Sequence, residues 1–314
     1  MKIRALMLGL AALTHLSCTE LIPISTSEVK DISVEMTAEK VARGRYLAMH
    51  VSSCIDCHSE RDFTKFAGPV KPDSFGKGGE RFGEEIGIPG TIYAPNITPH
   101  SLKDWTDGEL FRVITEGVTK DGKALFPLMP YKGFANMTPD DVTSIIAYLR
   151  TLDPVENSVP KRELNFPLNY IVRTIPSPYV EKNMPQNTSE EKGKYLVTIA
   201  DCGDCHTPME KGEPIEGMDF AGGNKYKLPW GEVTSANITP DSENGIGSWS
   251  KEAFIARFKQ SVTDPEAEYA AKGFNTIMPW TLYGGMTVED LGAIYDYLKT
   301  VKANPNSIQK FKKL

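Results

Sequence analysis

Long apolar runs, an excess of positive charge and abundant cysteine are all missing from this sequence of 314 residues. Beyond an apolar stretch at residues 5–13, which is itself too short to span a bilayer, no segment is long and apolar enough to predict a transmembrane helix. The formal net charge of −6 argues against nucleic acid as a partner, because phosphate binding requires a basic surface. With only five cysteines, neither cysteine pair has further thiols nearby to complete a zinc site.

Four of the five cysteines belong to two copies of the motif C-x-x-C-H. The motif residues are Cys54, Cys57 and His58 in the first copy and Cys202, Cys205 and His206 in the second. This is the attachment signature of a c-type haem, in which two thiols add across the haem vinyl groups and the histidine supplies an axial nitrogen. A thiol-redox pair would not need the histidine, and zinc would need two further ligands. The sequence therefore predicts two covalently bound haem c groups.

The two motifs lie within a long internal repeat whose copies are 148 residues apart. In both copies Gly-x-Tyr-Leu precedes the motif, Asn-Ile-Thr-Pro and a tryptophan follow it, and a helix containing Tyr-Leu closes the unit. These shared words start at Gly44, Asn96 and Tyr148 in one copy and at Gly193, Asn237 and Tyr297 in the other. Apolar residues at helical spacing predict that each unit begins and ends in a helix, with the small glycine allowing another helix to approach closely.

The repeat predicts an all-α fold of two tandem domains, at residues 38–153 and 189–303. Residues 154–188 between them carry six prolines, which exclude a long helix and predict a linker over the surface. Residues 304–314 are expected to form a short tail, and residues 18–37 a polar tether before the first domain.

The start of the chain has the form of an export signal. Lys2 and Arg4 form a basic region, the short apolar stretch follows, and Cys18 lies where bacterial lipoprotein signals are cut and the cysteine is acylated. The pattern before Cys18 is imperfect, because His15 stands where an aliphatic residue is normal. We predict a signal peptide at residues 1–17, a lipid anchor at Cys18 as the contact with the membrane, and a location in the bacterial periplasm or cell envelope. Simple cleavage without acylation is the alternative.

A haem iron held by one histidine has a second axial position, and its occupant decides the function. A Met-Pro pair that matches between the copies places Met129 and Met278 in loops, where the following proline fixes the backbone, so both are predicted as axial ligands. Met137 and Met286 also match, but each directly precedes a helix cap and is assigned to packing as a hydrophobic staple. His100 is a further, rarer ligand candidate for the first haem.

In combination, these words resemble the cytochrome c subunit of periplasmic alcohol, gluconate and sorbitol dehydrogenases, over nearly all of both repeats. The resemblance implies a class I cytochrome c fold for each domain. It also implies that His58 and Met129 bind the first iron and that His206 and Met278 bind the second. The chain departs from that family in having two haem motifs where those subunits usually have three. Residues 304–314 also lack the apolar character of the membrane anchor in which those subunits often end.

These features predict a periplasmic electron carrier rather than an enzyme. It would accept electrons from a dehydrogenase subunit or another cytochrome and pass them toward a terminal oxidase by outer-sphere transfer, because His/Met ligation closes the iron to substrates. The alternative is a dihaem enzyme of the peroxidase or thiosulfate-oxidising type, which would need one iron with an open axial position. A haem-bearing structural or sensory module is a third interpretation.

Overall fold

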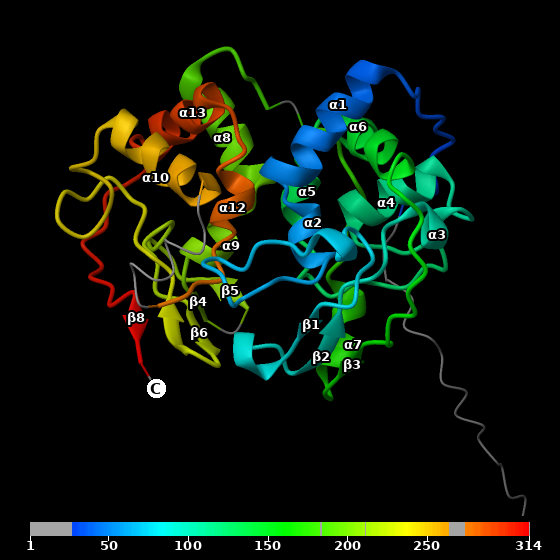
Figure 1. The fold of residues 1–314 in the computed structure, drawn as a ribbon, viewed down its shortest axis with the longest axis horizontal. Coiled ribbons are helices and arrows are strands. Elements are labelled where there is room, and N and C mark those ends of the chain that lie inside the picture. Colours follow the sequence, from blue (N-terminus) through cyan, green and yellow to red (C-terminus); the bar gives the residue numbers. More distant parts are fainter. Residues whose placement is uncertain (1–26, 183, 211, 264–273, 314) are drawn as a thin grey trace, which may run out of the picture.

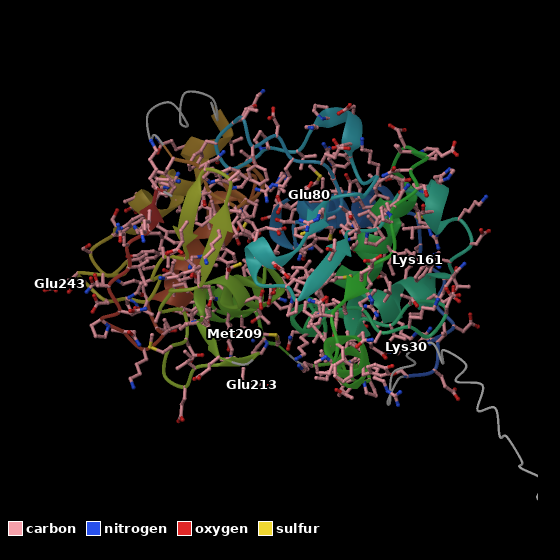
Figure 2. All side chains as sticks on the ribbon, turned by 90° about the horizontal axis from the view of Figure 1, so that it is seen from below. Lys30, Glu80, Lys161, Met209, Glu213 and Glu243 are labelled. Carbon is pink, nitrogen blue, oxygen red and sulfur yellow. The ribbon has the colours of Figure 1, made fainter. Side chains whose placement is uncertain are left out.

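The computed structural model of the chain describes residues 27–182, 184–210, 212–263 and 274–313. The predicted signal peptide and Cys18 lie outside these residues. Figure 1 shows the first repeat (residues 38–153, blue to green) beside the second repeat (residues 189–303, yellow-green to red), with most helices on one side and short strands along the opposite edge. Seen from below in Figure 2, Lys30 and Glu243 lie near opposite ends of the molecule. Within the described ranges, no helix has the length and apolar character needed to cross a membrane.

Each repeat opens and closes with a helix, and these two helices pack against each other. In the first repeat, α1 (Ala38–Tyr46) continues into the π-helical turn η1 (Leu47–Val51) and packs on α6 (Pro139–Arg150). In the second, α8 (Ser189–Ile199) packs on α13 (Val288–Leu298). A Cβ at Gly44 would lie 1.7 Å from a carbonyl oxygen of α6, and a Cβ at Gly193 would lie 1.9 Å from one of α13. The close approach predicted at these two glycines is therefore confirmed.

Further helices and helical turns lie between the opening and closing helices of each repeat. In the first repeat they are α2 (Cys54–Cys57), η2 (Pro72–Ser74), η3 (Glu84–Ile86), α3 (Pro99–Leu102), α4 (Asp107–Glu116) and α5 (Tyr131–Phe134). In the second they are α9 (Cys202–His206), α10 (Lys251–Thr263) and α12 (Trp280–Tyr283). Threonine caps fix where the closing helices begin, since Thr138 and Thr287 accept the backbone N–H of Asp141 and Asp290.

The prediction of an all-α fold is only partly right, because short antiparallel strands accompany the glycine-rich segments. In the first repeat the strands are β1 (Arg81–Phe82) and β2 (Gly90–Tyr93), and β3 (Glu163–Leu164) adds to their sheet from the segment that follows the repeat. In the second repeat the strands are β4 (Met209–Glu210), β5 (Glu213–Pro214), β6 (Lys225–Leu228) and β7 (Gly231–Thr234). The strand β8 (Phe311–Lys312) adds to the sheet of β6 and β7. β2 lies between β1 and β3, and β7 lies between β6 and β8. The glycine-rich segments satisfy their backbone groups by pairing with the chain that returns after each closing helix.

The segments expected as linker and tail contact the repeats closely. The linker contains α7 (Leu168–Ile171) and the turn η4 (Val172–Thr174), in which Val172 is fully buried. Asn157 donates to the carbonyl of Gly78, and Asn306 donates in the same way to the carbonyl of Gly222. The chain that follows each closing helix is thus hydrogen-bonded to the glycine-rich segment of its own repeat.

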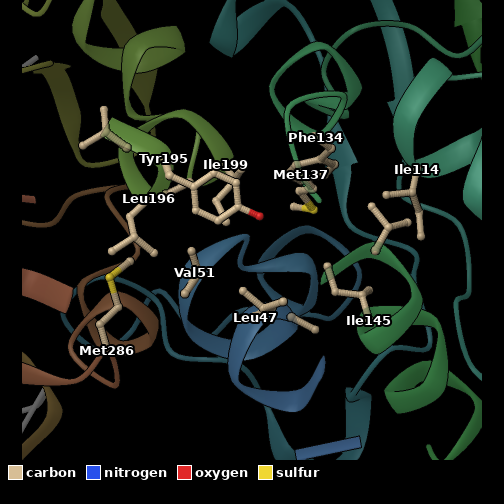
Figure 3. Close-up of a cluster of buried hydrophobic side chains, with 14 of the residues drawn as sticks. Leu47, Val51, Ile114, Phe134, Met137, Ile145, Tyr195, Leu196, Ile199 and Met286 are labelled. Carbon is tan, nitrogen blue, oxygen red and sulfur yellow. The ribbon is translucent and has the colours of Figure 1, made fainter. Parts of the chain in front are cut away.

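One hydrophobic core runs through both repeats. Figure 3 shows part of it, with Leu47, Val51, Ile145 and Met137 from the first repeat and Tyr195, Leu196, Ile199 and Met286 from the second. Each of these side chains is at most 2% exposed. Met137 and Met286 are therefore core residues, as predicted. Because the core is continuous, the packing of one repeat depends on the presence of the other.

A tyrosine from each repeat forms hydrogen bonds with the other repeat, and we call these two residues the exchanged tyrosines. Tyr46 of α1 donates to Asp290 at the start of α13, and Tyr195 of α8 donates to Asp141 at the start of α6. Each hydroxyl also accepts the backbone N–H of the threonine that caps the same helix, at 3.2 Å. Burial and the neighbouring carboxylate raise the pKa of Tyr46 to about 12 and also raise the pKa of Tyr195. Each repeat therefore completes the N-terminal cap of the closing helix in the other.

Replacing Tyr46 or Tyr195 with phenylalanine should lower the free energy of unfolding by about 1–3 kcal/mol, because a buried carboxylate and a cap N–H both lose a partner. Urea unfolding of each variant measures this change. The contribution of the Tyr46 hydroxyl should be complete below the ordinary tyrosine pKa of about 10 and should be lost as the pH rises through about 12. The phenylalanine variant should lack this part of the pH dependence.

The control for both variants is Tyr170→Phe, because the Tyr170 side chain is 55% exposed. Its free energy of unfolding should change by less than about 0.5 kcal/mol. Equally small changes for Tyr46→Phe and Tyr195→Phe would show that the exchanged tyrosines do not stabilise the contact between the repeats.

Candidate haem-binding sites

Each C-x-x-C-H motif forms a single helical turn that follows a residue with left-handed backbone geometry. Ser53 (φ 47°) precedes α2, and Asp201 (φ 53°) precedes α9. Neither residue is glycine, so this conformation costs free energy and needs support from the surrounding structure. The left-handed residue turns the chain sharply away from the opening helix and brings the two cysteines and the histidine onto one turn. The same geometry in both repeats indicates the same use.

The four motif cysteines are free thiols. Burial raises the pKa of Cys54 and of Cys202 to about 12, so both thiols are protonated at neutral pH. In the part of the chain that the structure describes, no three His, Cys, Asp or Glu side chains gather as a metal site would require. Among the described residues, neither motif therefore has the further ligands that a zinc site would need.

The two motif histidines are oriented in the same way. The Nδ1 atoms of His58 and His206 lie 2.7 Å from the backbone carbonyl oxygens of Pro95 and Ala236. Because a carbonyl oxygen only accepts, Nδ1 is assigned the proton and the lone pair of Nε2 is left for a metal. Burial lowers the pKa of both imidazoles, which favours the neutral form that metal ligation requires.

The repeated Asn-Ile-Thr-Pro sequence holds these two carbonyls in place. Asn96 accepts the backbone N–H and the hydroxyl of Thr98, both at 2.8 Å, and Asn237 accepts the same groups of Thr239 at 2.9 and 2.7 Å. Each asparagine also donates to the chain that follows the closing helix. All four side chains are buried. The Asn-Ile-Thr-Pro sequence thus forms a buried turn in each repeat, and this turn positions one backbone carbonyl against the motif histidine.

A glycine in each repeat supports the motif turn from its backbone. The N–H groups of Gly78 and Gly222 donate to the backbone carbonyls of the two motif histidines, at 2.9 and 2.7 Å. Both glycines have positive φ, at 70° and 68°. A Cβ at either position would lie 2.4 Å from the carbonyl carbon that belongs to the histidine-facing residue. Both the conformation and the lack of space therefore require glycine here.

The predicted axial methionines lie in the loops that lead into α5 and α12. Met129 and Met278 are partly buried and pack against the same core as Cys54 and Cys202. Their backbone carbonyls accept equivalent hydrogen bonds across the following proline, both at 2.8 Å. Their role as axial ligands stays a prediction. His100, the rarer candidate, is exposed on α3.

Several buried side-chain polar atoms lack a hydrogen-bond partner among the described residues, and two of them belong to aromatic side chains. The two aromatic donors are Oη of Tyr131 in the first repeat and Nε1 of Trp230 in the second. A buried donor without an acceptor is costly, so such groups usually have a partner that completes them. The carboxylate oxygens of a haem are suitable acceptors. Free thiols, oriented neutral imidazoles and unsatisfied donors all fit a covalently attached haem.

Sequence reasoning missed residues that support these sites through side-chain hydrogen bonds. Asn157 and Asn306 stand 149 residues apart at matching places, so a closer comparison of the repeats would have found them. His50, by contrast, has no counterpart, and its Nδ1 lies 2.9 Å from the carbonyl of Leu282 in the second repeat. Arg61 also reaches across to the second repeat. No local pattern in the sequence signals such contacts.

Known proteins resemble this chain over most of its length. A family model for cytochrome c matches residues 190–302. The cytochrome c subunit of alcohol dehydrogenase (quinone) from Gluconobacter oxydans is 29% identical over 285 residues, which are 84% of this chain and 55% of that subunit. The fructose dehydrogenase cytochrome subunit from Gluconobacter japonicus is 32% identical over 286 residues, which are 86% of this chain and 54% of that subunit. The chain thus spans about half the length of these two relatives.

A diheme cytochrome c-type protein from Cereibacter sphaeroides matches more evenly. It is 31% identical over 263 residues, which are 80% of this chain and 82% of that protein. These names confirm the resemblance that the sequence motifs predicted, and they agree with a cytochrome subunit rather than a catalytic one. The chain belongs to the cytochrome c family.

Proposed function

We propose that this protein is an electron carrier with two covalently bound haem c groups, one in each repeat. The observation that supports this best is the matched pair of imidazoles, each with Nδ1 on a backbone carbonyl at 2.7 Å. Cys54 and Cys57 would attach the first haem, and Cys202 and Cys205 the second. The axial ligands would be His58 and Met129 for the first iron, and His206 and Met278 for the second.

The haem would supply reversible one-electron chemistry. The protein residues would exclude reactions with substrates at the iron. A neutral imidazole and a thioether would fill both axial positions, so no substrate could reach the iron. The soft thioether favours reduced iron and raises its reduction potential. The two sites match in their histidine, its carbonyl partner and the Met-Pro loop, which supports two carrier sites over the alternative of a dihaem enzyme with one open iron.

The proposal includes a division into two cytochrome c domains, at residues 38–153 and 189–303, with residues 154–188 as the connection. Its support is that the opening and closing helices of each repeat pack against each other. Each repeat also contains its own C-x-x-C-H motif, Asn-Ile-Thr-Pro turn and Met-Pro loop.

The proposed electron donor is a dehydrogenase subunit or another cytochrome, and electrons would continue toward a terminal oxidase. The names of the relatives from Gluconobacter support a dehydrogenase as donor. A net charge of −6 suits docking to a basic surface and disfavours nucleic acid. We also propose export to the bacterial periplasm or cell envelope with a lipid anchor at Cys18, on the basis of the sequence of residues 1–18.

Removing the predicted axial methionines tests this function directly. Met129→Ala should open the first haem to carbon monoxide or imidazole and leave the second haem low-spin, because alanine offers no ligand. Met278→Ala should have the same effect on the second haem alone. Met129→His should keep the first haem low-spin and lower its reduction potential, because methionine ligation raises the potential. Absorption spectra with added ligand and potentiometric titration measure these changes.

The matched controls are Met137→Leu and Met286→Leu, because both methionines are buried in the core. Both spectra should stay unchanged, with a stability cost of about 1 kcal/mol or less, because the side-chain volume is conserved. A first haem that stays low-spin in Met129→Ala and opens in His100→Ala would have His/His ligation. That result would favour the dihaem enzyme over the carrier.

The lipid anchor can be tested separately from the haem sites. Wild-type protein should partition into the detergent phase, and Cys18→Ser should move it to the aqueous phase, because serine cannot carry the thioether-linked lipid. Phase separation followed by immunodetection measures the distribution. A wild type found wholly in the aqueous phase would contradict the anchor and leave the electron-carrier proposal untouched.

A further inference from the structure

The segment just before Met278 is held by the first repeat. Residues 61–68, which follow the first C-x-x-C-H motif, are hydrogen-bonded to residues 275–277 of the second repeat. We name these two segments together the clasp. One aromatic contact of the clasp also joins the two repeats, since the ring centroid of Phe63 lies 5.0 Å from that of Trp230.

Arg61 is the residue of the clasp that links the first motif to the second repeat. Its guanidinium donates to Asp56, inside the first motif, at 3.0 Å and to the backbone carbonyl of Ile277 at 3.3 and 3.4 Å. It also donates to the carbonyls of residues 67 and 68, at 2.6 and 2.9 Å. Its charge opposes the rise in pKa that burial causes at Glu80, which Figure 2 labels near the middle of the molecule. The side chain of Arg61 is only 8% exposed, so these bonds fix it in one orientation.

Asn275 is the second anchor and is fully buried. Its Nδ2 donates to the carbonyls of residues 63 and 65, at 2.8 and 3.0 Å, and its Oδ1 accepts the N–H of Ala67 at 2.8 Å. The hydroxyl of Thr276 then accepts the backbone N–H of Met278 at 3.1 Å. A continuous set of hydrogen bonds therefore leads from the first haem motif to the backbone of Met278.

The residues at the matching positions of the other repeat differ from Arg61 and Asn275. Met209 stands three residues after the second motif histidine, where the first repeat has Arg61. Phe126 stands three residues before Met129, where the second repeat has Asn275. The side chain of Met209 is 43% exposed and cannot donate a hydrogen bond. The clasp thus supports the Met-Pro loop of the second repeat only.

We propose that Arg61 is a positioning residue for the axial methionine of the second haem. This inference rests on the proposed function, in which Met278 is that ligand. The guanidinium holds the carbonyl of Ile277, and residues 63–67 hold Asn275, so the loop keeps its thioether in one place. The first repeat therefore determines how firmly the second iron is ligated.

Arg61→Lys separates the position of the loop from the charge beside it. Lysine keeps a positive charge near Asp56, but its single ammonium cannot reproduce the planar fork that reaches the carboxylate, the carbonyl of Ile277 and residues 67–68 together. The loop before Met278 should loosen while the charge near the first haem stays the same.

In the haem-loaded protein, Arg61→Lys should speed amide hydrogen exchange of residues 274–280 about tenfold, because charge-assisted hydrogen bonds to the loop are lost. Added imidazole should then displace the methionine at the second haem and leave the first haem unchanged. The weak red absorption band of methionine-bound ferric haem should therefore fall to half. In a Met129→Ala background, where only the second haem keeps its methionine, the substitution should remove the rest of the band. Asn275→Ala should give the same pattern.

The matched control is Arg81→Lys, because Arg81 forms a surface pair with Glu85 and is 52% exposed. Exchange and imidazole resistance should stay at wild-type values in this variant. If Met278→Ala opens the second haem but both clasp variants behave like wild type, the clasp inference is overturned and the proposed function stands. If Met278→Ala leaves the second haem closed, the ligand assignment and this inference are both overturned.

Discussion

The hydrogen bond between each motif histidine and one backbone carbonyl is the contact on which the candidate sites depend. It assigns the proton to Nδ1 and directs Nε2 to a metal, and it is the same 2.7 Å in both repeats. The Asn-Ile-Thr-Pro turn holds the segment that carries the carbonyl, and a positive-φ glycine donates to the backbone of the histidine. The chain that follows each closing helix also supports the site, because Asn157 and Asn306 donate to the backbone carbonyl of that glycine.

The two repeats are joined by contacts of two different kinds. The exchange of Tyr46 and Tyr195 is reciprocal, so it stabilises the packing of the repeats without distinguishing one site from the other. The clasp of Arg61 and Asn275 runs in one direction, from the first motif to the second Met-Pro loop. A duplicated unit can in this way acquire two sites with the same ligands and different support. The properties of the second site then depend on the whole chain.

Local patterns in the sequence predicted the features that have a local cause. The caps at Thr138 and Thr287, the close helix contact at Gly44 and the buried staple methionines follow from the nearest few residues and their spacing. The strands were missed because their partners return from beyond the closing helices, where proline-rich or short sequence suggested only linker and tail. Comparison of the repeats identified Tyr46 as a shared residue, but it could not predict the hydrogen bond to Asp290 in the other repeat. Arg61 and Asn275 have no match in the other repeat, so comparison of the copies could not reveal them.

The central claim is that a histidine and a methionine close both irons. A redox titration of the wild-type protein, followed by absorption and electron paramagnetic resonance, tests this claim most directly. The account predicts two haems that are low-spin when fully oxidised, half reduced and fully reduced, and that do not bind added carbon monoxide. A high-spin or carbon monoxide-binding fraction equal to one haem, in any of these states, would contradict it, because one iron would then have an open axial position.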